Sequence, residues 1–147
     1  MFRIIVVVML CCAAALTPAL AGGEAEKEAI TKAILDYAEG WYEGDAARME
    51  SCLHPELAKR VMKADKDSGK GKLESMDAAT LIGYTKAAYG KKTPKDQQLK
   101  DVTIFDVYGN AATAKLEMAG WVDYMQLAKQ DGKWLIVNVL WEPKPGK

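Results

Sequence analysis

Hydrophobic and polar positions follow two different periods along the chain. In residues 24–53 and 77–90, apolar side chains recur every three or four residues, which is the spacing of one face of an amphipathic helix. After residue 101 the spacing changes to two, as in strands that bury one face. This order predicts an α+β fold in which helices come first and a sheet follows.

About three helices are expected in the first ninety residues. The apolar stripe predicts helices over 24–41, 45–53 and 77–90, with aspartate caps at the start of the second and third. Residues 56–62 alternate weakly and predict a short strand. Residues 63–72 contain Lys, Asp, Ser and Gly without an apolar anchor, which predicts a loop or a hairpin tip.

The second half predicts an antiparallel meander. Residues 102–105 and 112–118 form a strand pair around a Gly-Asn turn, and a two-residue Asp-Gly turn precedes the last strand, 133–142. Gly120 interrupts the alternation ahead of 121–129, as a β-bulge does, so the sheet is expected to bend there. A bent sheet can curl around a pocket.

The amino terminus has the pattern of a secretory signal peptide. Arg3 precedes the apolar run 4–16, and Ala19 and Ala21 are the small residues that signal peptidase requires before Gly22. The run is too short to span a bilayer comfortably. We therefore expect a signal peptide over residues 1–21, cleaved after Ala21, a single domain over 22–147 in the periplasm or secreted, and no membrane association after cleavage.

Charge and cysteine content narrow the function classes. The chain of 147 residues has 20 Lys+Arg, 20 Asp+Glu and one His, so it lacks the positive charge that nucleic-acid binding needs, and no metal site or cofactor is expected. Two of the three cysteines, Cys11 and Cys12, fall in the predicted signal peptide. The third, Cys52, is expected to be a buried small hydrophobe, with a catalytic thiol as the alternative.

The closing residues resemble a known superfamily. Leu53-His54-Pro55-Glu56-Leu57, Asp123-Tyr124 and the stretch 131–138 (DGKWLIVN) with Trp141 resemble the nuclear-transport-factor-two-like superfamily, also called SnoaL-like or ketosteroid-isomerase-like, in its putative lumazine-binding branch. The resemblance implies a cone-shaped, curved, mostly antiparallel sheet packed against the helices and enclosing one pocket. Because this fold hosts isomerases, cyclases, dehydratases and plain binding modules, the resemblance alone does not choose a reaction.

Seven residues are candidates for this pocket. Aromatic side chains can stack a flat ligand or belong to the core, and a lone imidazole can act as a base or fix the corner beside Pro55. A buried carboxylate can act as a base, and one at the sheet rim accepts hydrogen bonds. Asp123 lies two residues after Trp121, so both side chains take the same face of the strand, although a one-residue slip at Gly120 would turn Asp123 outward. Asn138 lies two residues after Ile136 on one face and either ties the sheet to a helix or points at a ligand. The candidates are Tyr37, Trp41, His54, Tyr84, Trp121, Asp123 and Asn138.

Three functions fit these residues. The first is an exported domain that binds a small apolar or aromatic molecule without catalysis. The second is an enzyme of the isomerase, cyclase or dehydratase type, with Asp123 or His54 as general base and a tyrosine as donor. The third is an assembly module that forms a homodimer through the outer face of its sheet. The aromatic lining with few convergent polar groups favours the first.

Overall fold

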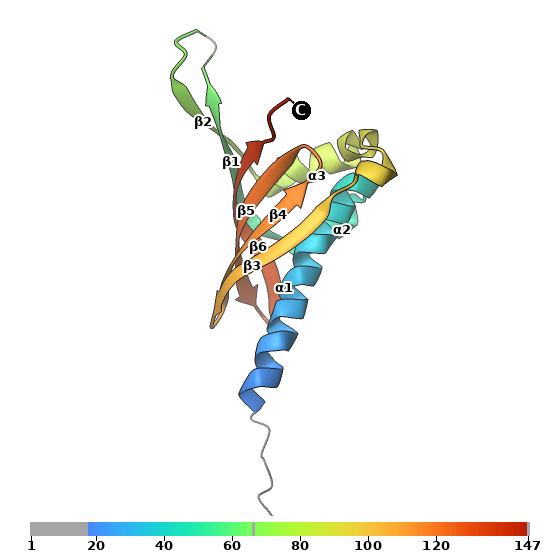
Figure 1. The fold of residues 1–147 in the computed structure, drawn as a ribbon, viewed down its shortest axis with the longest axis vertical. Helices are drawn as coiled ribbons and strands as arrows, with labels where there is room; N and C mark the ends of the chain where they lie inside the picture. Colours follow the sequence, from blue (N-terminus) through green and yellow to red (C-terminus); the bar gives the residue numbers. More distant parts are fainter. Residues whose placement is uncertain (1–17, 66, 147) are drawn as a thin grey trace, which may run out of the picture.

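The structure is a computed structural model, and it describes residues 18–65 and 67–146. Three α-helices and six strands follow one another as the α+β prediction requires (Figure 1). The elements in chain order are α1 (Pro18–Glu43), α2 (Ala46–Cys52), β1 (Leu53–Ala64), β2 (Gly71–Met76), α3 (Ala78–Lys86), the 3-10 turns η1 (Tyr89–Lys92) and η2 (Lys95–Gln97), β3 (Lys100–Tyr108), β4 (Ala111–Met118), β5 (Trp121–Gln130) and β6 (Lys133–Pro143).

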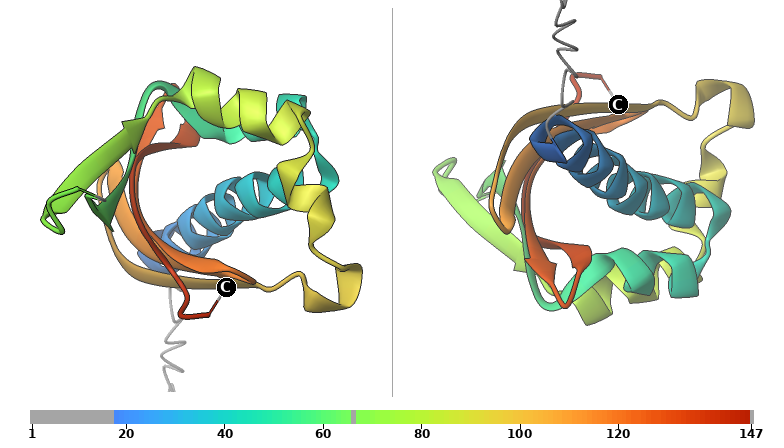
Figure 2. Two further views of the ribbon diagram at one scale, coloured as in Figure 1. Left: turned by 90° about the horizontal axis from the view of Figure 1, so that it is seen from above. Right: turned by 90° about the horizontal axis from the view of Figure 1, so that it is seen from below.

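The strands form a single curled sheet. Their order is β2-β1-β6-β5-β4-β3, and β1 with β6 is the one parallel pair within it. The sheet wraps around α1, so the helix lies along its concave face (Figure 2). The predicted cone with an antiparallel sheet around the first helix is confirmed.

An apolar stripe fixes α1 to the concave face. Ile30, Ile34 and Ala38 are fully buried and pack in one cluster with strand residues such as Leu116 and Ile136. Burial of each large aliphatic side chain contributes about 1.5–3 kcal/mol. The three-and-four spacing in the sequence therefore did mark the buried face of this helix.

Both predicted aspartate caps are present. The Asp45 side chain accepts a hydrogen bond from the Arg48 amide at 3.0 Å, and the Asp77 side chain accepts one from the Thr80 amide at 2.8 Å. The expected end of the third helix at residue 90 was wrong, because α3 ends at Lys86 and Ala88 adopts a left-handed backbone with φ of 61°.

One prediction about the strands needs correction: Gly120 lies in the short connection between β4 and β5 and is no bulge. The polar segment 63–72 forms the tip of a hairpin, which was one of its two predicted structures, because β2 pairs antiparallel with residues Lys59–Ala64 of β1. This hairpin, which we call the β1–β2 arm, projects beyond the rest of the sheet (Figure 1).

The bulge lies instead in β6. Gln126 pairs with Asn138 while the next residue, Leu127, pairs with Ile136, so Val137 is an extra residue in β6. An extra residue reverses which face the following side chains take. Val139 is therefore buried, whereas Asn138 faces outward.

The predicted signal peptide lies mostly outside the described residues. Of residues 1–21, only 18–21 are described, as the first turn of α1. No helix in the described part of the chain is long and apolar enough to cross a membrane.

Candidate functional site

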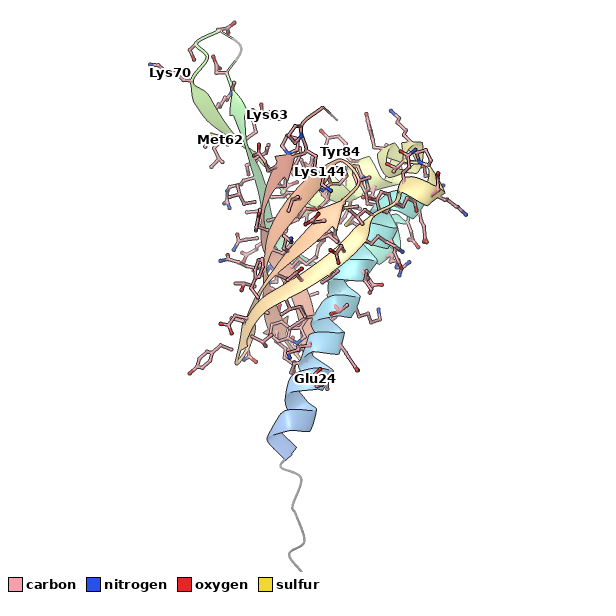
Figure 3. All side chains as sticks on the ribbon, viewed as in Figure 1. Glu24, Met62, Lys63, Lys70, Tyr84 and Lys144 are labelled. Atoms are coloured by element: carbon pink, nitrogen blue, oxygen red, sulfur yellow. The ribbon has the colours of Figure 1, made fainter. Side chains whose placement is uncertain are left out.

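A small aromatic cavity lies between α1, α3 and the concave face of the sheet. Its volume is about 150 Å³. We call it the aromatic cavity; it is lined by Tyr37 and Trp41 of α1, Leu81 and Tyr84 of α3, Lys59 of β1, Met76 of β2, Trp121 of β5 and Trp141 of β6. Tyr84 is 44% exposed and marks the solvent-facing rim at the α3 end of the molecule (Figure 3).

Three indole rings form one wall of this cavity. Trp41 and Trp121 meet edge to face with ring centroids 5.6 Å apart, and Trp121 and Trp141 do so at 6.2 Å. Edge-to-face pairs hold each ring in one orientation. The three rings are therefore fixed relative to one another.

A buried ion pair lies beside the aromatic wall. Lys59 is 4% exposed and Asp123 is fully buried, and the Lys59 ammonium donates to Asp123 Oδ1. Asp123 Oδ2 accepts a second hydrogen bond from Trp121 Nε1 at 2.8 Å. Lys59 lines the cavity with apolar atoms of its side chain, while Asp123 does not line it, so both charged groups lie behind the apolar surface of the cavity.

Strand geometry explains how the pair forms. Leu57, Lys59 and Val61 alternate onto the buried face of β1, which places a lysine between two core residues. β6 separates β1 from β5, and Asp123 is a fully buried residue of β5. A buried lysine needs a counter-charge, and this carboxylate supplies it.

Burial perturbs the titration of two cavity groups. Burial lowers the pKa of Lys59 from its usual value, and the adjacent Asp123 carboxylate opposes part of that shift. Burial also raises the pKa of Tyr37 well above the ordinary range, and the negative charge of Asp123 adds to the increase. The Tyr37 phenol therefore stays protonated at neutral pH.

Two donors behind the cavity surface have spare capacity. The Lys59 ammonium has three N–H groups, and its hydrogen bond within the described chain is the one to Asp123. It also lies 5.5 Å from the ring centroid of Tyr37 and 5.2 Å from that of Trp141. Trp141 Nε1 is buried with no hydrogen-bond partner in the described chain.

Five of the seven predicted residues come together here. Tyr37, Trp41, Tyr84 and Trp121 line the cavity, and Asp123 supports it from behind through Trp121 and Lys59. The expected inward parity of Asp123 holds because Gly120 introduces no slip, and Tyr124 accordingly faces outward at 50% exposed.

The other two predicted residues lie elsewhere. Asn138 was expected to share a face with Ile136, and this was wrong because the β6 bulge turns it to the outer face, where it donates to Gln126 at 3.0 Å. His54 lies at the start of β1, where its Nδ1 accepts a hydrogen bond from the Glu56 amide, and it does not line the aromatic cavity. The two candidate bases, His54 and Asp123, therefore share no site.

Four cavity residues were not among the predicted site residues: Lys59, Met76, Leu81 and Trp141. The alternation of Leu57, Lys59 and Val61 carried the signal for Lys59, since a lysine at an inward strand position needs a buried partner. Trp141 had no such signal, because its face depends on the bulge at Val137.

Cys52 is buried, as predicted. It is 1% exposed, its Sγ donates to the Met49 carbonyl at 3.0 Å, and burial raises its thiol pKa to about 12. A thiol of this kind is a poor nucleophile at neutral pH. Residues 18–65 and 67–146 also contain no cluster of three metal-binding side chains.

The outer face of the sheet has a larger, open groove of about 780 Å³. Its apolar side chains come from several strands, and Phe105, Tyr124 and Leu140 are each at least half exposed. Among the described residues that line it, Arg60 alone is charged.

The sequence of this chain also matches a known family. A family described as "Putative lumazine-binding" matches residues 25–142. The chain belongs to this family. The match contains every residue that lines the aromatic cavity, so the cavity lies within the domain that defines the family. No curated protein matches the chain.

Solved structures agree with the fold of this family member. A nuclear-transport-factor-two-like protein of unknown function from Shewanella baltica is 23% identical, with a TM-score of 0.65 over 82% of this chain and 95% of that one. A similar protein with a cystatin-like fold from Novosphingobium aromaticivorans is 15% identical, with a TM-score of 0.63 over 92% and 94%. These likenesses show that the chain has the fold of nuclear-transport-factor-two-like proteins.

Proposed function

We propose that this protein binds a small flat molecule in the aromatic cavity and does not transform it. The observation that carries the proposal is an apolar cavity walled by three partly buried tryptophan rings in fixed orientations. Ligand sites are concave and lined mainly by hydrophobic and aromatic side chains.

The volume of the cavity indicates the size of the ligand. Pockets for drug-sized molecules usually enclose about 300–1,000 Å³, whereas this cavity encloses about 150 Å³. An apolar cavity of roughly that size accepts benzene in an engineered protein. The aromatic cavity therefore suits one ring more closely than the two fused rings of lumazine.

Binding is favoured over catalysis because the buried carboxylate is already engaged. Asp123 uses one oxygen for Lys59 and the other for Trp121, and it does not line the cavity. A general base must reach the proton that it removes. In this arrangement Asp123 holds its two neighbours in place.

The test is saturation-transfer NMR with toluene as probe. The Leu81→Phe variant places a larger ring in the cavity wall, and Leu99→Phe makes the same change at a site 41% exposed and outside the cavity. We expect toluene to bind the wild type and Leu99→Phe, and to bind Leu81→Phe at least tenfold more weakly. Equal binding by the two variants would contradict the location of the site.

We also propose export, on the signal-peptide pattern alone. The experiment is expression in a bacterial host, recovery of the periplasmic fraction and intact-mass measurement. A chain that begins at Gly22 supports export, and a chain that retains residues 1–21 in the cytoplasm contradicts it.

The outer groove favours a second role, self-association through the sheet. Its exposed apolar side chains lie on an almost uncharged surface, so two copies can approach without charge repulsion. We expect Leu140→Lys to shift the protein toward monomer in analytical ultracentrifugation, while Leu99→Lys has no effect. A wild-type protein that stays monomeric at high concentration would contradict this role.

A further inference from the structure

The aromatic cavity has room only for the apolar part of a ligand. Its lining surface is wholly apolar, because Lys59 contributes aliphatic atoms to it and directs its ammonium to Asp123. A polar group that entered would lose its hydration and gain no hydrogen bond, which is costly. With a volume of about 150 Å³ the cavity suits one ring, so any polar group of the ligand lies outside, beyond the rim.

The rim of the cavity continues into the 3-10 turn η1. The Tyr89 ring of η1 meets the Tyr84 ring of the rim edge to face, with centroids 5.5 Å apart. Gly90, the next residue of η1, packs directly against the backbone carbonyl of Trp41, which also lines the cavity. Tyr84 and Tyr89 are 44% and 51% exposed, so their two rings form a surface between the cavity and solvent, which we call the tyrosine ledge.

Positive charge lies at the outer end of the tyrosine ledge. The Lys92 ammonium is 5.0 Å from the ring centroid of Tyr89. Residues 78–95 contain four lysines and no acidic residue, and none of the four forms an ion pair within the described chain. These exposed lysines are Lys86, Lys91, Lys92 and Lys95. An anionic group on the ledge is therefore attracted, and an ammonium group is repelled.

We propose that the ligand of this protein is an amphipathic anion, with one hydrocarbon ring in the aromatic cavity and a carboxylate or another anionic group, joined to the ring by a short chain, beside the Lys92 ammonium. The inference rests on the proposed binding function and adds the chemical class of its ligand. Burial of the ring supplies most of the affinity, and the exposed charge pair at Lys92 adds a smaller share that depends on salt.

The experiment compares three probes that differ only at the end of the same short chain: 4-phenylbutyrate, 4-phenylbutan-1-ol and 4-phenylbutylammonium. In NMR titrations at low ionic strength we expect the carboxylate to bind about two- to fivefold more tightly than the alcohol, and the ammonium to bind more weakly than the alcohol. In about 1 M salt, where the Debye length is about 3 Å, the three affinities should converge. Equal binding of the three at low salt, or tightest binding of the ammonium, would overturn the inference.

A lysine variant tests where the anionic group lies. In Lys92→Gln the affinity for 4-phenylbutyrate should fall about two- to fivefold, while the affinity for the alcohol stays unchanged. The control Lys70→Gln removes the same charge from the β1–β2 arm, far from Tyr84, and should change neither affinity (Figure 3). An undiminished preference for the carboxylate in Lys92→Gln, or an equal loss in the two variants, would overturn the inference.

The outcomes separate this inference from the proposed function. If the alcohol binds and the carboxylate gains nothing, the cavity is a binding site without a preference for anions, and the inference alone fails. If none of the three probes binds, the binding function itself fails, and the inference fails with it.

Discussion

Replacing Lys59 with methionine tests how strongly the buried ion pair supports the fold. The change keeps most of the side-chain volume and removes the only cation that contacts Asp123 in the described chain. Asp123 is fully buried, and removing one partner of a buried pair typically costs about 3–5 kcal/mol, because the other charge is left uncompensated. That loss is a large share of the roughly 5–15 kcal/mol that stabilises a domain.

Urea unfolding of the purified chain measures this loss directly. With a denaturant slope of about 1–3 kcal/mol per molar, a loss of 4 kcal/mol lowers the unfolding midpoint by roughly 2 M. Replacing both charges, Lys59→Met with Asp123→Leu, should restore most of the stability, because well-packed apolar residues often replace a buried pair without loss. Trp121 then lacks an acceptor, so a residual loss of about 1–3 kcal/mol is expected.

The double variant decides whether the two charges act as a pair. The account predicts that it is more stable than either single variant. If the double variant loses as much free energy of unfolding as the two single variants together, Lys59 and Asp123 act independently, and the reasoning is refuted.

Further predictions concern Gly90, Tyr42 and Cys52. A methyl group at Gly90 would overlap the backbone carbonyl of Trp41, so Gly90→Ala should lower the free energy of unfolding measured in urea by more than about 2 kcal/mol and weaken toluene binding. The control Gly83→Ala, in open space on α3, should raise the free energy of unfolding by about 0.5–1 kcal/mol. Similar stabilities of the two variants would contradict the close approach at Gly90. Tyr42→Phe should lose about 1–3 kcal/mol in the same assay, because this phenol bridges a backbone carbonyl and a backbone amide at 2.9 and 3.0 Å, and an unchanged midpoint would contradict that bridge. The thiol pKa of Cys52 is raised from 9.0 to about 12, so at pH 8 this thiol should react with iodoacetamide about a thousandfold more slowly than a free thiol. Mass spectrometry of the peptide that contains Cys52 measures the rate, and rapid labelling would contradict its burial. The folded thiol keeps a proton that the unfolded one loses, so the contribution of Cys52 to the free energy of unfolding should fall as the pH rises from 9 toward 12.

The sequence predicted the fold well where periodicity is local. The stripe of α1 and the aspartate caps of α2 and α3 depend on residues three or four positions apart, and these were confirmed. The inward orientation of Asp123 was also predictable, since it follows from the alternation of side chains within β5.

Features that depend on pairing between distant segments were not predictable. The extra residue Val137 is defined only by the register of β6 against β5, and it reversed the faces of Asn138 and Trp141. β2 has little apolar character of its own and is a strand because β1 pairs with it. The pairing of Lys59 with Asp123 joins two strands that are separated by β6, 64 residues apart in the chain.

The most direct test of the aromatic cavity as a binding site is an NMR titration that follows the indole N–H signals of the four tryptophans as toluene is added. Trp41, Trp121 and Trp141 line the cavity, while Trp134 lies outside it, where its Nε1 donates to Glu26 at 2.6 Å, and serves as an internal control. The account predicts saturable shifts for the three cavity indoles and a constant Trp134 signal. Constant signals for all four tryptophans, or equal shifts that include Trp134, would contradict it.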